Sequence, residues 1–152
     1  MLVQRDTYFH AVQGRLKLRE EPGTMAELIS YARADRTEAR ISSYRVVPVT
    51  DPDGLVHALA DALGVRAVVE KERRLLLYEN VRIHLDRVAG LGDFVELEAV
   101  VTGPGGPAAE QGKVDELRRA LDITDDRLVA RGYADLLERR GIIVPRRQSE
   151  RF

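Results

Sequence analysis

Three segments of the chain place charged residues at alternate positions, with apolar residues between them. They are residues 15–19 (Arg-Leu-Lys-Leu-Arg), 81–86 (Val-Arg-Ile-His-Leu-Asp) and 94–98 (Phe-Val-Glu-Leu-Glu). Because successive side chains of an extended strand point to opposite faces, each segment would have one charged and one apolar face. The charged face is where we expect function.

The same alternation gathers cations and anions from other segments onto that face. The cationic positions are Arg15, Lys17, Arg19, Arg33, Lys71, Arg73 and Arg82, and the anionic positions are Asp35, Asp86, Glu96 and Glu98. At an effective dielectric constant of about 20, two like charges about 6 Å apart repel by roughly 3 kcal/mol. Such crowding requires water, counter-charges or a polyanionic ligand, and a ligand explains it most simply.

Two arrangements of the strands fit this pattern. A flat sheet would hold its apolar face against a core and its charged face in water. A sheet curled on itself would instead turn its charged face into a lumen and its apolar face outward under helices. The pattern alone favours the flat sheet.

Strands are predicted over the first two thirds of the chain and helices over the last third. The predicted strands are residues 2–9, 15–20, 27–33, 41–49, 81–88 and 94–101, with two further strands and a turn over 67–79. One helix is expected near residues 54–63, where Asp51 and Pro52 precede it and Gly64 ends it. Residues 103–107 (Gly-Pro-Gly-Gly-Pro) have no helix or strand capacity, and helices follow over about 111–122 and from Thr124 to Gly141.

The composition fits one domain over residues 1–141, followed by a polar tail over 142–152. The chain has 152 residues, of which 44% are hydrophobic and 32% charged, and its formal charge is −1. It has no cysteine, and no apolar run approaches the ~20 residues that cross a bilayer. These features predict a cytoplasmic protein without a membrane segment, and the near-neutral charge argues against a nucleic-acid partner.

Eight short motifs occur along the chain in the order that they have in one known family. They are Gln4–Phe9, Gly14–Glu20, Tyr31–Asp35, Ser43–Tyr44, Val69–Arg73, His84–Val88, Leu91–Phe94 and Glu96–Glu98. Together they resemble the CYTH superfamily, the group of class IV adenylate cyclases and thiamine triphosphatases, and most closely its bacterial cyclase-like branch. The likeness extends from Gln4 to about Leu137 and includes Gly132-Tyr133-Ala-Asp-Leu-Leu near its end.

The resemblance implies an α+β fold built on an antiparallel β-barrel, a triphosphate tunnel with a charged lumen and outer helices. It also implies roles for individual residues. Lys17 and Arg19 match the strand that grips the phosphates, Lys71, Arg73 and Arg82 match other basic positions of the tunnel wall, and Asp86, Glu96 and Glu98 match acidic positions that hold Mg²⁺ or Mn²⁺. These roles suit the residue types, because guanidinium groups make forked contacts to phosphate and hard dications prefer carboxylate oxygens.

Other polar residues of these segments are candidates for binding substrate. They are Arg15, Arg33, Tyr31, Arg40 and His84. For Tyr31, filling space within the sheet is the better explanation, and for His84 a hydrogen bond to a neighbouring residue is at least as good a one. Arg40 is either a cation at the tunnel mouth or an ordinary surface charge. Asp6 and Asp35 are expected to orient the basic residues through ion pairs rather than to bind metal.

One element of the family pattern has no match in these residues. The family's first strand carries a Glu-x-Glu-x-Lys signature, and Met1 falls immediately before the family's second strand. We therefore expect a barrel lacking its first strand, with about seven strands, an open seam and fewer metal-binding carboxylates. Three explanations remain: an upstream start, a strand supplied by a second copy or another chain, or a new use of the fold. The open seam predicts a homo-oligomer or a strand-complementing partner.

The leading hypothesis is an enzyme that acts on a nucleotide or other organic triphosphate with Mg²⁺ or Mn²⁺. It would act either as an adenylate cyclase or as a triphosphatase, and the sequence does not choose between them. The alternatives are a barrel that binds a phosphorylated or anionic ligand without turnover, and a biosynthetic enzyme that has re-used the cavity.

Overall fold

The computed structural model describes residues 1–32, 44–101 and 104–142, which form an α+β fold around one antiparallel sheet. The strands lie in the order β4-β3-β2-β1-β5-β6-β7. Their bounds are β1 Leu2–Phe9, β2 Arg15–Glu20, β3 Ala26–Tyr31, β4 Tyr44–Val49, β5 Val65–Tyr78, β6 Val81–Val88 and β7 Gly92–Ala99. The helices are α1 Pro52–Leu63, α2 Gly106–Ala120 and α3 Tyr133–Arg139, with a 3-10 turn at Asp125–Arg127.

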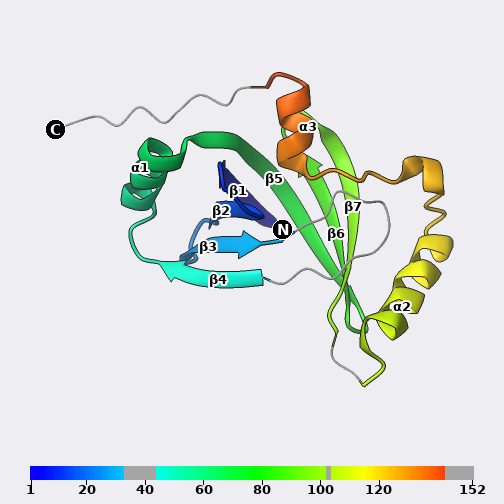
Figure 1. The fold of residues 1–152 in the computed structure, drawn as a ribbon. Coiled ribbons are helices and arrows are strands. Elements are labelled where there is room, and N and C mark those ends of the chain that lie inside the picture. The colour runs from blue at the N-terminus through cyan, green and yellow to red at the C-terminus, as the bar shows by residue number, and fades with distance from the viewer. Residues whose placement is uncertain (33–43, 102–103, 143–152) are drawn as a thin grey trace.

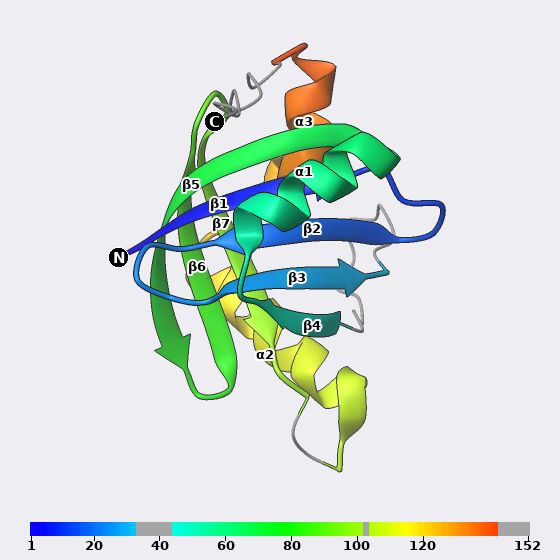
Figure 2. The same cartoon turned by 90° about the vertical axis from the view of Figure 1, so that its left-hand side faces the viewer.

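The sheet is bent into a trough, and β5 curves from the β1–β4 half into the β6–β7 half (Figures 1 and 2). On the outer face, Leu18 and Phe9 form an apolar core against Leu55 and Leu59 of α1. Lys17 and Arg19, which alternate with Leu18 on β2, therefore point into the trough. The curled arrangement with an inward charged face is correct, and the flat sheet that the pattern alone favoured is wrong. The apolar side chains outside and the helix over them determine which face is inward.

A second apolar core lies inside the trough at one of its ends. Ala134 and Leu137 of α3 pack there against Tyr8, Val69 and Val88 of the sheet. Helix α3 thus covers one end of the inner face, while α2 lies beyond β7 on the outside of the molecule (Figure 1).

The sheet is not closed, and β4 and β7 are its edge strands in the described part of the chain. The open sheet of seven strands over the described residues agrees with a tunnel-like fold. The expected homo-oligomer or strand-complementing partner stays a prediction.

Three predicted elements differ from the structure. Residues 67–79 were expected to contain a turn, but β5 is one continuous strand of 14 residues, paired with β1 over its first part and with β6 over its second. Helix α2 begins at Gly106, within the segment predicted to lack helix capacity, because Pro107 lies in its first turn, where a proline loses no helical hydrogen bond. Only a 3-10 turn follows Thr124, and the last helix begins at Tyr133, where the Asp135 carboxylate accepts a bond from the Gly132 amide.

The predicted polar tail lies outside the described residues from residue 143 onward, as does part of the strand predicted over 41–49. Among the described helices, none has the length and apolar character needed to span a membrane.

We expect Leu18→Ala to destabilise the fold strongly, because Leu18 has no exposed surface between the sheet and α1. Removing a fully buried leucine side chain leaves a cavity and costs about 2–5 kcal/mol of unfolding free energy. Urea denaturation would measure the loss, with Val12→Ala at a fully exposed turn position as a control that should change little. Equal small losses in the two variants would contradict this account of the outer core.

Candidate functional site

The centre of the inner face is a carboxylate surrounded by three cations. Asp6 on β1 accepts hydrogen bonds from Lys17 Nζ at 2.8 Å, from Lys71 Nζ at 3.0 Å and from Arg19 Nε and Nη2, both at 2.8 Å. Arg19 lies directly opposite Asp6 across the β1–β2 ladder, and Lys71 is supplied by β5 on the other side of β1. Asp6 therefore orients the cations, as expected from the sequence. Three positive charges around one carboxylate leave positive charge for a second anion. This group of Asp6, Lys17, Arg19 and Lys71 is the basic cluster.

Burial and charge shift the pKa values of this cluster. Burial alone would raise the pKa of Asp6, but the charges of Lys17 and Lys71 and the hydrogen bonds from Arg19 hold it well below its usual value. Burial lowers the pKa of Lys71 to about 8; the charge of Asp6 opposes this shift, and the neighbouring cations Lys17, Arg19 and Arg73 add to it. Lys71 is thus the cation of this cluster that can lose its proton near neutral pH.

A second group of charged side chains lies beside the basic cluster. Arg73 on β5 donates to both oxygens of Asp86 on β6, at 2.7 and 2.6 Å, and to Glu96 Oε2 on β7 at 3.1 Å. Tyr133 of α3 donates its hydroxyl proton to Asp86 Oδ2 at 2.8 Å. Burial, and next the charge of Asp86, raise the pKa of Tyr133, so it remains a donor. His84 Nδ1 lies 3.2 Å from Glu96 Oε2.

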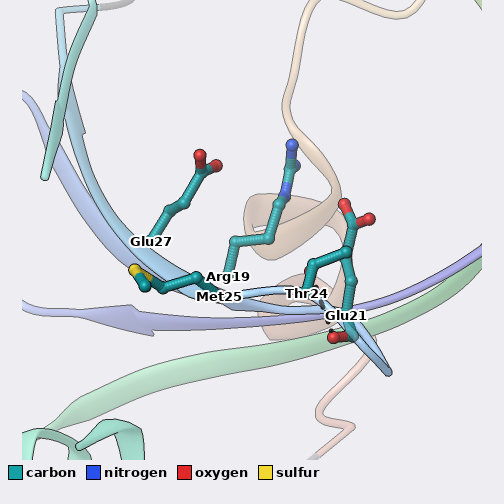
Figure 3. Close-up of a pocket in the computed structure, with 5 residues that line it drawn as sticks. All are labelled: Arg19, Glu21, Thr24, Met25 and Glu27. Carbon is teal, nitrogen blue, oxygen red and sulfur yellow. Dashed lines mark hydrogen bonds between the residues drawn. The ribbon is translucent and has the colours of Figure 1, made fainter. Parts of the chain in front are cut away.

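The charged face continues to the end of the trough that lies away from α3. Arg82 Nη1 and His84 Nε2 lie 3.7 and 3.8 Å from Glu98 Oε2, at positions where Arg82 is exposed and Glu98 is partly exposed. On the opposite wall, a pocket of about 230 Å³ is lined by Arg19, Glu21, Thr24, Met25 and Glu27. Figure 3 shows Arg19 and Glu27 rising from the same side of the sheet beside the β2–β3 turn. Arg19 therefore belongs both to the basic cluster and to this pocket.

Helix α3 is fixed at the other end by ion pairs. Arg15 Nη1 donates to Asp135 Oδ1 at 2.9 Å, and Arg66 donates to Asp135 and to Glu138. Arg15 thus lies at the covered end, away from Asp6. Tyr31 lies in the core beneath α3 and against the ring of Tyr44.

Most of the residues predicted from the sequence lie together on the inner face. Lys17, Arg19, Lys71, Arg73, His84, Asp86 and Glu96 form one continuous charged band, with Arg82 and Glu98 beside it. Arg33 and Arg40, and with them Asp35, fall outside the described residues. Sequence reasoning did not assign Tyr133 or Asp135 to the site, although the motif Gly132–Leu137 contains both.

The acidic residues serve as internal counter-ions in this arrangement. Asp86 is bonded to Arg73 and Tyr133, and Glu96 is bonded to Arg73 and His84. No three His, Cys, Asp or Glu side chains among residues 1–32, 44–101 and 104–142 are grouped so that they could hold a metal ion. The carboxylates have the right chemistry for Mg²⁺ or Mn²⁺, but as they lie they do not form a ligand set, and the metal stays a prediction.

The chain belongs to the CYTH domain family, whose pattern matches residues 2–133. No functionally curated protein matches the sequence significantly. Among solved structures, the PH1012 protein of Pyrococcus horikoshii is similar at a TM-score of 0.78 and 22% identity, over 89% of this chain and 82% of that one. A candidate adenylate cyclase from Vibrio parahaemolyticus is similar at a TM-score of 0.71 and 18% identity, over 90% and 80% of the two chains. At these identities the similarity shows the shared fold alone.

We expect Asp6→Asn to destabilise the protein by about 3–5 kcal/mol, because an amide leaves two buried lysines and the partly buried Arg19 without their counter-charge. The pKa of Asp6 is lower in the folded state than its ordinary value of 3.8, so its contribution is present above about pH 4 and is lost as the pH falls below that. Urea denaturation at pH 7 and at lower pH would measure both effects.

The control for this substitution is Asp93→Asn, which breaks an exposed ion pair with Arg87 and should leave the stability almost unchanged. Equal stability of the two variants at pH 7 would show that Asp6 does not hold the basic cluster together.

Proposed function

We propose that this CYTH protein is an enzyme that binds the triphosphate group of a nucleotide or other organic triphosphate on the inner face of its sheet. The observation that carries the proposal is the excess of cations around Asp6, with Arg73 next along β5. Phosphate oxygens would accept hydrogen bonds from Lys17, Arg19 and Lys71, and they would share these donors with Asp6. Membership of the CYTH family and the similarity to the structure of a candidate adenylate cyclase support this proposal.

The residues present would act by positioning and charge neutralisation. The cations are already oriented by Asp6 on β1, and they lie on the two strands that flank β1, so little reorganisation is required when the anion binds. Tyr133 and Arg73 hold Asp86 in a fixed orientation beside the bound phosphates.

A second candidate is binding without turnover, and one observation favours it. Asp86 and Glu96 are engaged with Arg73, His84 and Tyr133 rather than arranged around a metal. A protein of this kind would bind the triphosphate and leave it intact.

The two candidates differ in products. Incubation with ATP and Mg²⁺ or Mn²⁺ would yield cyclic AMP and pyrophosphate from a cyclase, and ADP and phosphate from a triphosphatase, whereas binding alone would yield neither.

The substitution Arg19→Gln should weaken the binding of ATP and inorganic tripolyphosphate by about 10- to 100-fold, as expected for the loss of a charge-assisted hydrogen bond. Calorimetry measures these affinities.

The matched control is Arg87→Gln, which removes an exposed arginine from the outer face and should leave the affinities unchanged. Absence of binding by any triphosphate, or equal effects of the two substitutions, would refute the proposal.

Deprotonation of Lys71 predicts opposite pH dependences for two quantities, the affinity for ATP and the stability of the fold. Because the pKa of Lys71 is about 8 in the folded protein, against an ordinary value of 10.5, ATP affinity should fall as the pH rises above 8. The unfolded chain keeps this proton up to a higher pH, so the contribution of Lys71 to folding stability should rise between about pH 8 and 10.5.

Both pH effects should disappear in Lys71→Met, which would bind ATP more weakly at pH 7 but with little dependence on pH. Calorimetry and urea denaturation from pH 7 to 10 would measure them. Identical pH profiles of the parent protein and Lys71→Met would assign the titration to another group.

A further inference from the structure

The last part of β5 extends beyond its neighbour on one side. β1 pairs with β5 from Val65 to Arg73, where Leu2 is the partner of Arg73. In the described part of the chain, Arg74–Tyr78 pairs only with β6. This part of β5 therefore forms a wall of the trough at the end that α3 does not cover.

The side chains on the inner face of β5 change from charged to apolar along the strand. Lys71 and Arg73 are buried within the charged band, but the next two inward positions are Leu75 and Leu77, which are 43% and 71% exposed. Leu75 lies opposite His84 and Leu77 lies opposite Arg82 on β6. We call Leu75 and Leu77 the apolar strip; it begins where the cationic positions of β5 end.

The two ends of the trough differ in what they can accept. At one end α3 packs on the inner face, and Tyr133 reaches Asp86. At the other end lie the apolar strip, the exposed Arg82, and the pocket beside Arg19 with Met25 on the opposite wall. A ligand that enters from the open end meets the apolar strip first and the basic cluster further in.

We propose that a triphosphate binds with its phosphates directed toward α3, and that Leu75 and Leu77 contact the organic group that the triphosphate carries. This inference rests on the proposed function and adds the two residues that would distinguish an organic triphosphate from inorganic tripolyphosphate. Inorganic polyphosphate would use the cations but gain nothing from two leucines, whereas a flat organic group would remove their apolar surface from water. Phosphates would lie less favourably along the strip than at the basic cluster, because Arg82, which faces Leu77, is already paired with Glu98, and the inward cations of β5 lie deeper on the strand.

A tryptophan placed on the strip tests the proposal directly, because the chain has no tryptophan of its own. In Leu77→Trp the indole would lie on the inner face, and in the control Leu76→Trp it would lie on the outer face of the same strand. Leu76 is 41% exposed and Leu77 is 71% exposed, so both positions reach solvent, and they lie on opposite faces of the strand. ATP should quench the indole emission of Leu77→Trp by stacking of its base, and inorganic tripolyphosphate should not. Neither ligand should change the emission of Leu76→Trp.

Calorimetry with the same ligands gives a second readout. The double substitution Leu75→Ser and Leu77→Ser should weaken ATP binding by about five- to tenfold, in line with the loss of apolar contact, and leave tripolyphosphate affinity unchanged. Leu76→Ser should change neither affinity.

The outcomes separate this inference from the proposed function. If neither ATP nor tripolyphosphate binds the parent protein, the proposed function fails and the inference fails with it. If both bind, but the ratio of their affinities is the same in the double variant and the emission of Leu77→Trp does not respond to ATP, only the inference is overturned. Emission that depends on protein concentration and not on ATP would show that a second copy covers the strip, and would also overturn it.

Discussion

The carboxylate of Asp6 has no contact with water, and a buried charge of this kind is tolerated only when it is paired and hydrogen-bonded. Lys17, Arg19 and Lys71 meet that requirement together, and each of them is equally dependent on Asp6 because each is itself largely buried. The strands that carry these residues are adjacent in the sheet, so the ion pairs also fix β1 between β2 and β5. The stability of the inner face and its capacity for an anion are thus two aspects of one arrangement of charges.

Helix α3, near the end of the described residues, is also held on the inner face by pairs of charged and polar side chains. Its apolar residues, such as Leu137, pack on the inner face, while Asp135 and Tyr133 pair with Arg15 and Asp86 on either side. A short helix has little stability of its own, and these contacts are what keep it in place. Covering one end with apolar groups also excludes water there, which strengthens the electrostatic interactions nearby.

The inward charged face could be predicted from the sequence by combining two signals, the alternation of residues along each strand and the order of the family motifs. The alternation in residues 15–19 and 81–86 correctly identified which side chains share a face, because the period of a strand is a local property. It gave the wrong preference about which face is inward, since that depends on Leu55 and Leu59 of a helix elsewhere in the chain. The ordered family motifs corrected that preference.

Local patterns were least informative where partners come from distant segments. Four consecutive apolar or aromatic residues, Leu75–Tyr78, carry no sign of whether a turn interrupts β5, and pairing with β6 decides it. The contact of Tyr133 with Asp86 spans 47 residues and has no signature in the spacing of either residue. Residue type alone likewise could not show whether Asp86 and Glu96 pair with Arg73 or bind a metal ion, because carboxylates can do either.

Lys71 and Arg73 occupy successive inward positions of β5, so they serve the two charge groups from a single backbone segment. Their separation along the strand is about 6.6 Å, set by the rise of two residues rather than by flexible side chains. A one-residue insertion between them would turn Arg73 to the outer surface and leave Asp86 buried without its main counter-charge. The number of residues between Lys71 and Arg73 is therefore more strictly constrained by the structure than the identity of Glu72, because the side chain of Glu72 points outward and is exposed.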